Sequence, residues 1–205
     1  MPKSGTGRLS RAGLLTVGAR RGAALLVAGS AFGALAEPAA ADPLTDNDLA
    51  FARLLVGVEL LSIDFYLRAM NAARFRPVGQ KYLRTAFTNE VDHYRTVSEI
   101  LTGAGYSPAV SSDFEFAYPR HSFGTRLSIA RLGRSLETVF VGAYLGAVGD
   151  VQAKGLVQPL ARIAASEAQH LSLWGFELGG RPVSSAYPAP LAADQVSAAL
   201  DQFTT

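Results

Sequence analysis

The feature that most constrains this chain is an internal repeat in which acidic and imidazole residues occupy apolar helical stripes. In each copy a Glu is followed seven residues later by a Tyr, and a Glu-x-x-His pair follows further along. The first copy consists of Glu59, Tyr66, Glu90 and His93. The second copy consists of Glu137, Tyr144, Glu167 and His170, at offsets of 78 residues for Glu and Tyr and 77 for the pair. This near-constant offset predicts two similar helical hairpins.

A Glu and a His three residues apart on a helix can reach toward the same point in a bundle core. Two hairpins related by an approximate twofold axis would therefore bring four carboxylates and two imidazoles together. Each buried carboxylate costs several kcal/mol without counter-charge, and two divalent cations would supply the four positive charges needed. A single Glu-x-x-His is common on solvated helix faces, but both pairs here lie on apolar stripes. We expect a dinuclear metal site made of Glu59, Glu90, His93, Glu137, Glu167 and His170.

The apolar periodicity predicts an all-α fold, a four-helix bundle followed by a short C-terminal helix. The helices are expected at about 45–70, 78–102, 125–148, 151–178 and 191–203. Residues 104–122, rich in Pro, Ser and aromatics, are expected to form a long crossover between the second and third helices. The inward stripe of the third helix is expected to include Leu127, and that of the fourth helix Glu177. No segment has the alternating pattern of a strand.

Several residues on the stripes have more than one interpretation. Tyr66 and Tyr144 either donate hydrogen bonds to ligand carboxylates or are core aromatics with a polar tip. Arg134 lies on an inward stripe, and we expect it to extend past the bundle end rather than pair with a carboxylate. His121, in the crossover, is expected on the surface. The small residues of the third helix favour close helix packing or a dimer contact, with a path for dioxygen less favoured: Gly142, Ala143, Gly146 and Ala147.

Composition narrows the chemistry and the domain count. The chain has 205 residues and no cysteine, which excludes disulfides, thiolate metal sites and iron–sulfur clusters. Any metal must therefore be bound by His, Asp and Glu. This length favours one main domain, expected at residues 42–180 and followed by a Pro-rich tail with a short helix at 181–205.

Residues 1–41 have the pattern of a secretory signal peptide. Several Arg precede the small apolar run 22–36, and Ala39 to Ala41 provide a cleavage site. A retained anchor is the alternative, but the run is shorter than the roughly twenty residues that span a bilayer. The pair Arg20 and Arg21 allows twin-arginine (Tat) export as well as the Sec route. Without this leader the net charge is slightly negative, so we expect no nucleic-acid partner, and cleavage would leave no stable membrane anchor.

The repeated motif resembles the ferritin and rubrerythrin superfamily. Within it, the stretches 59–69 and 137–146 are similar to exported bacterial ferritin-like proteins often labelled desiccation-related. The resemblance covers about residues 45–180. It implies two iron ions, or two manganese ions in some branches, with Glu90 and Glu167 as bridging ligands. The terminal ligands it implies are Glu59 and Glu137, with one His nitrogen per metal from His93 and His170.

The same resemblance implies an exported protein, in the periplasm, cell envelope or medium, that activates O₂ or H₂O₂. A ferroxidase or peroxidase type of oxidoreductase, acting on ferrous ion or peroxide, is the leading expectation. The alternatives are iron sequestration by a homo-oligomeric cage, a metal-stapled structural protein that protects during desiccation, and a dimanganese catalase. Because cysteine is absent, the chain lacks the rubredoxin-like centre of rubrerythrin, and any reductant must come from elsewhere.

Overall fold

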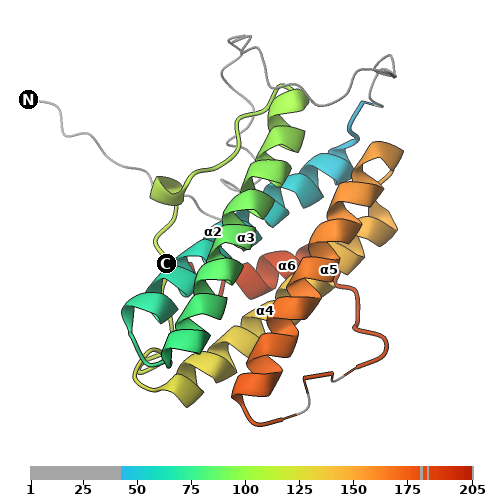
Figure 1. Ribbon diagram of the computed structural model, residues 1–205. Coiled ribbons are helices and arrows are strands. Elements are labelled where there is room, and N and C mark those ends of the chain that lie inside the picture. Colours follow the sequence, from blue (N-terminus) through green and yellow to red (C-terminus); the bar gives the residue numbers. More distant parts are fainter. Residues whose placement is uncertain (1–42, 181, 184, 205) are drawn as a thin grey trace, which may run out of the picture.

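The structure is a computed structural model that describes residues 43–180, 182–183 and 185–204 (Figure 1). The predicted signal peptide lies outside the described residues. Within them the fold is all-α, as predicted, and no helix is long and apolar enough to cross a bilayer. The helices are α2 (Asp46–Asn71), α3 (Pro77–Gly103), α4 (Arg126–Asp150), α5 (Lys154–Glu177) and α6 (Ala193–Leu200), with a short 3₁₀ helix η2 (Ser111–Asp113).

Two antiparallel hairpins, α2 with α3 and α4 with α5, form the bundle. Helix α2 packs against α4 and α3 packs against α5, while α6 lies across α2 and α4. The connection from α3 to α4 runs along the length of the bundle (Figure 1). Its middle is held by the C-terminal residues, because the amide N–H of Ala117 donates to the carbonyl of Phe203 at 2.8 Å. The expected long crossover is therefore present, and the tail fixes it in place.

The helix starts follow local sequence rules. Thr45 and Asp48 form a capping box at the start of α2. Asp48 also accepts a 2.7 Å hydrogen bond from the amide of Gln152, which ties this helix start to the link between α4 and α5. That link is extended at Val151, so α5 begins at Lys154, three residues later than the periodicity predicted. Backbone geometry and the Asp48 contact thus override the apolar pattern there.

Two residues expected to point inward do not enter the core. Leu127 is 42% exposed, and the half-buried Glu177 forms a 2.6 Å ion pair with Arg126. Both lie in terminal turns, where the stripe continues beyond the last layer of the core. Arg134 is half-buried and lies near Gly180 at the same end, in agreement with the expected outward direction. The exposed His121 is on the surface as expected, with a positive φ of 65°.

The small residues of α4 accommodate the chain's own tail. The amide of Leu191 donates to the carbonyl of Gly142 at 2.8 Å. A Cβ at Gly146 would lie 1.8 Å from the carbonyl oxygen of Leu191, so any larger residue would displace the segment. The close approach is therefore made by an extended stretch of the same chain. The helix packing and dimer contact that the sequence favoured do not account for these two glycines.

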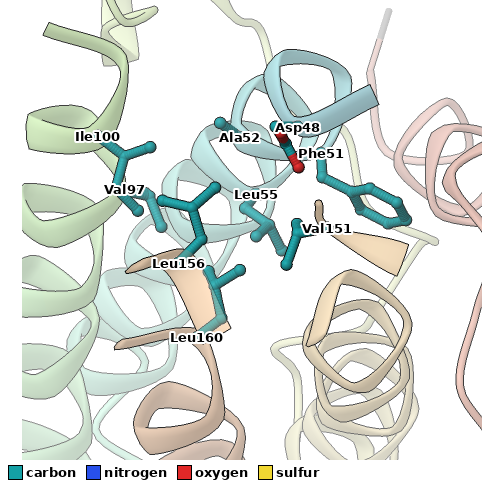
Figure 2. A pocket seen from close by; sticks show the side chains of 9 residues that line it. All are labelled: Asp48, Phe51, Ala52, Leu55, Val97, Ile100, Val151, Leu156 and Leu160. Atoms are coloured by element: carbon teal, nitrogen blue, oxygen red, sulfur yellow. The ribbon is translucent and has the colours of Figure 1, made fainter. Parts of the chain in front are cut away.

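Apolar layers close both ends of the bundle core. Figure 2 shows side chains from α2, α3 and α5 converging at one end, with Leu55, Val97 and Leu160 among them, and no water-sized space remains between them. Toward the other end, Trp174 packs edge-on against Phe65 and Phe75 at ring-centroid distances of 5.6 and 6.0 Å. A polar layer is enclosed between these two apolar layers.

Candidate metal centre

The polar layer contains the six residues singled out by the repeat, contributed by all four long helices. Glu59 comes from α2 and Glu137 from α4, while α3 and α5 each contribute a Glu-x-x-His pair. Every one of the four carboxylates is at most 1% exposed, and the two histidines are 9% and 5% exposed. Four acids at this depth are expensive to bury unless other charges compensate them.

The six residues form two overlapping groups. One group contains Glu59, Glu90, His93 and Glu167, and the other contains Glu90, Glu137, Glu167 and His170. Within each group, one possible ligand atom per residue lies within 4.8 Å of the others. Glu90 and Glu167 belong to both groups. These two carboxylates are therefore shared between two candidate metal positions. Glu59 and Glu137 each belong to only one of them.

The distances around the two histidines match closely. Nδ1 of His93 lies 2.8 Å from Oε1 of Glu167 and 3.3 Å from Oε2 of Glu90. Nδ1 of His170 lies 2.8 Å from Oε1 of Glu90 and 3.3 Å from Oε2 of Glu167. The roles of the two helices are exchanged, as a twofold axis between the hairpins requires. The symmetry inferred from the sequence offset therefore extends to individual atoms.

Each tyrosine of the repeat donates a hydrogen bond to the terminal carboxylate of the opposite hairpin. The hydroxyl of Tyr66 donates to Oε1 of Glu137 at 2.5 Å, and that of Tyr144 donates to Oε1 of Glu59. The indole N–H of Trp174 donates in turn to the Tyr66 oxygen at 3.1 Å. Of the two interpretations of these tyrosines, the geometry agrees with hydrogen bonding to the carboxylates, which fixes their orientation.

The central pair of acids and the imidazoles stabilise one another's charged forms. Burial tends to lower the pKa of both histidines, but hydrogen bonds with Glu167 and Glu90 raise it to about 9 for His93 and about 11 for His170. Burial likewise tends to raise the pKa of Glu90, and hydrogen bonds with His170 and His93 outweigh it, so the pKa falls to about 2. The imidazoles therefore carry protons when these side chains supply the only charges.

The pKa values of the two terminal acids, Glu59 and Glu137, shift in the opposite direction from that of Glu90. Burial, followed by the nearby charges of Glu90 and Glu167, raises the pKa of Glu59 well above its usual value. Burial and the charge of Glu167 do the same for Glu137. When no cation is nearby, both acids therefore hold a proton more tightly than a solvent-exposed Glu does. Protons on the imidazoles and on these acids thus offset carboxylate charge in the cluster, in place of metal charge.

The donor set fits a pair of divalent cations. In the described part of the chain, Oε2 of Glu59 and Oε2 of Glu137 are buried and accept no hydrogen bond. Such orphaned carboxylate oxygens are costly, and binding to a cation would satisfy them. Hard carboxylate oxygens with one imidazole per position suit iron or manganese better than copper or calcium. The residues present are thus compatible with the predicted dinuclear site.

Two neighbours of the site were not found from the sequence. Nδ2 of Asn89 lies 3.1 Å from Nε2 of His170, on the outer edge of that ring. Trp174 lies four residues after His170 on α5, but nothing in the sequence pattern indicates that its N–H donates to Tyr66. Both contacts connect residues far apart in sequence, so helical periodicity alone carries no signal for them.

A comparison with known families agrees with this geometry. A sequence model described as a ferritin-like domain matches residues 47–179, which include all six residues of the cluster. No curated protein matches the chain in sequence.

Proposed function

Because the chain belongs to the ferritin-like domain family, we propose that its buried cluster holds two iron ions and acts as an oxidoreductase of ferroxidase or peroxidase type. The observation that supports this most strongly is the pair of overlapping ligand groups, which share Glu90 and Glu167. An acidic cluster formed by chance has no reason to repeat the same ligand set around a twofold axis. Two manganese ions are the alternative occupants.

The six residues of the cluster fall into two kinds of ligand in this proposal. Glu90 and Glu167 would help to hold both ions, and each remaining Glu and His would help to hold one. Four side-chain ligands per ion leave coordination positions open for a small molecule. A bound iron pair would supply two-electron redox chemistry with O₂ or H₂O₂.

The surroundings would hold these ligands in place. The crossed hydrogen bonds from Tyr66 and Tyr144 orient the terminal carboxylates. The apolar layers above and below exclude bulk water, which strengthens electrostatic interactions inside. We also propose that the protein is exported and protects its host against iron and peroxide, with O₂ or H₂O₂ and ferrous ion as its small-molecule partners.

The test measures ferrous-ion oxidation and peroxide consumption by the purified, iron-loaded protein. The comparison variant carries both Glu90→Ala and Glu167→Ala, and the matched control is Glu99→Ala, an exposed Glu on the same helix as Glu90. We expect the wild type and the control to accelerate at least one reaction, and the double variant to show only the background rate. Equal rates for the wild type and the double variant would refute the proposal.

Two other results of these measurements would indicate a different function. Iron binding and thermal stabilisation without turnover would indicate a metal-stapled structural protein. A hollow oligomer in light scattering that takes up many irons per chain would indicate iron storage.

A further inference from the structure

The two halves of the repeat differ on the outer side of the cluster. A pocket of about 290 Å³ lies between α3 and α5, which run side by side (Figure 1). Its lining consists of Asp92, His93, Thr96, Pro159, Arg162 and Ile163. His93 is thus shared between this pocket and the buried cluster.

His93 is also the most solvent-exposed member of the cluster. Its side chain is 11% exposed, against 6% for His170 and at most 1% for the carboxylates. Nδ1 of His93 faces Glu167 and Glu90, so the opposite edge of the ring is turned away from the carboxylates. Among the described residues, no side chain hydrogen-bonds Nε2 of His93. A small molecule in the pocket therefore meets a member of the cluster directly.

The matching face around His170 carries larger residues at two positions. At the repeat offset of 77, Leu173 corresponds to Thr96 and Asn89 corresponds to Ser166. The Asn89 amide covers the outer edge of the His170 ring, with Nδ2 at 3.1 Å from Nε2. On the His93 side, the smaller Thr96 lines the pocket. The symmetry of the ligands is thus broken in the layer immediately outside them.

The two ends of the bundle are packed. The packed layer of Figure 2 has no water-sized space, and the aromatic layer around Trp174 occupies the opposite end. The groove between α3 and α5 beside His93 is therefore the best-supported route from solvent to the cluster.

The charges at this pocket favour an anion. Arg162 is exposed and lines the pocket, and no ion-pair partner for it is present in the described part of the chain. Asp92, the acid in the lining, is paired with Arg95 at 2.7 Å. The guanidinium of Arg162 would attract small anions and increase their rate of arrival.

We propose that small anions reach the metal centre through the pocket beside His93, attracted by Arg162, and that the His170 face is closed to them. The inference rests on the proposed function, because it takes the bound metal ions as the target of the anion. It adds a route and a ligand class that the ligand set alone does not define.

The experiment uses the full chain loaded with Co²⁺, whose visible absorption reports its ligands, and azide as the small anion. Azide association is followed by stopped-flow absorbance. Thr96→Leu introduces the residue found at the matching position, and Leu173→Thr is the reciprocal control on the closed face. We expect Thr96→Leu to slow association several-fold with little change in the azide Kd at equilibrium, and Leu173→Thr to match the wild type.

Arg162→Gln is a surface change that leaves the core intact and tests the charge separately. We expect slower azide association at low salt, and a rate that no longer falls as salt is added. Wild-type rates in both Thr96→Leu and Arg162→Gln, or faster association in Leu173→Thr, would overturn the route while leaving the metal site standing. A wild-type chain that binds no Co²⁺ would overturn the proposed function and this inference together.

Discussion

At the scale of single residues, the unusual feature is a pair of crossed tyrosine-to-carboxylate hydrogen bonds that are not equivalent. Tyr66 both donates to Glu137 and accepts from Trp174, whereas Tyr144 donates to Glu59. Removing the Tyr66 hydroxyl therefore leaves two buried groups without a hydrogen bond, the Glu137 carboxylate oxygen and the Trp174 N–H. Removing the Tyr144 hydroxyl leaves only the Glu59 oxygen without one. Each orphaned buried group costs about 1 to 3 kcal/mol.

We therefore expect Tyr66→Phe to lower the free energy of unfolding of the metal-free protein more than Tyr144→Phe does, by about 1 kcal/mol or more. Urea unfolding of both variants measures this, with Tyr82→Phe, at a 52% exposed position, as the control. In addition, each core variant should bind metal about tenfold more weakly, as is typical when an orienting partner of a ligand is lost. Equal stability of Tyr66→Phe and Tyr144→Phe would contradict the account.

The shifted pKa values predict opposite pH dependences with and without metal. Glu59 and Glu137 have a pKa above 4.5, and His93 and His170 have a pKa above 6.5, at about 9 and 11. The folded state thus holds more protons than the unfolded state, so the metal-free protein should lose stability as pH rises above about 5 and on through 9. Metal must displace these protons, so metal affinity should rise over the same range.

Calorimetry near neutral pH in buffers of different ionisation enthalpy should show proton release when two divalent ions bind, with about two protons coming from His93 and His170. Thermal unfolding of the metal-free protein at several pH values measures the predicted fall of its stability with rising pH. Metal affinity that does not change with pH would mean that the buried acids and imidazoles are not the ligands.

At the scale of helices, the sequence predicted the elements well where helical periodicity was the only influence. The four long helices, the crossover and the short terminal helix all appear, and the cluster residues share the expected faces. The errors arise from interactions that periodicity does not contain. Leu127 and Glu177 lie beyond the last core layer, and the start of α5 is set by the contact between Asp48 and Gln152.

The glycines of α4 give a prediction at this scale. Gly146→Ala should lower the free energy of unfolding by about 1 to 3 kcal/mol, because its Cβ would overlap the backbone of Leu191 and displace the tail. Gly149→Ala, in the same helix but with open space around it, should be neutral or stabilising by up to about 1 kcal/mol. Urea unfolding distinguishes the two variants. Similar effects of both would show that the tail does not pack on α4 in solution.

Asp48, at the start of α2, gives a second prediction at the scale of helices. Its carboxylate accepts from the amides of Thr45 and Gln152, and these hydrogen bonds outweigh burial and lower its pKa below 3.8. Asp48→Asn should therefore cost about 1 to 3 kcal/mol of stability near neutral pH. Because a lowered pKa contributes stability above the unfolded value that is lost as pH falls, the difference from wild type should shrink below about pH 4. A difference that stays constant with pH would exclude the charged form as the cause.

At the scale of the whole molecule, the fold is two similar hairpins that enclose one polar layer between two apolar ones. The bundle alone would not need four buried acids, and replacing them with apolar residues would be expected to stabilise it. The crossover and the C-terminal segment close the outside, where Leu191 packs on α4 and Phe203 holds Ala117. The buried acids therefore lower the stability of the metal-free bundle, which is the pattern expected when metal binding is the function.

The most direct test of that claim is the number of metal ions bound per chain. Metal-free protein is equilibrated with Fe²⁺ without oxygen, or with Mn²⁺, then separated from free ions and subjected to elemental analysis. The structure predicts two ions per wild-type chain and fewer than one in the Glu90→Ala, Glu167→Ala double variant, since both positions share these residues. A wild-type chain that retains no metal, or a double variant that retains as much as wild type, would contradict it.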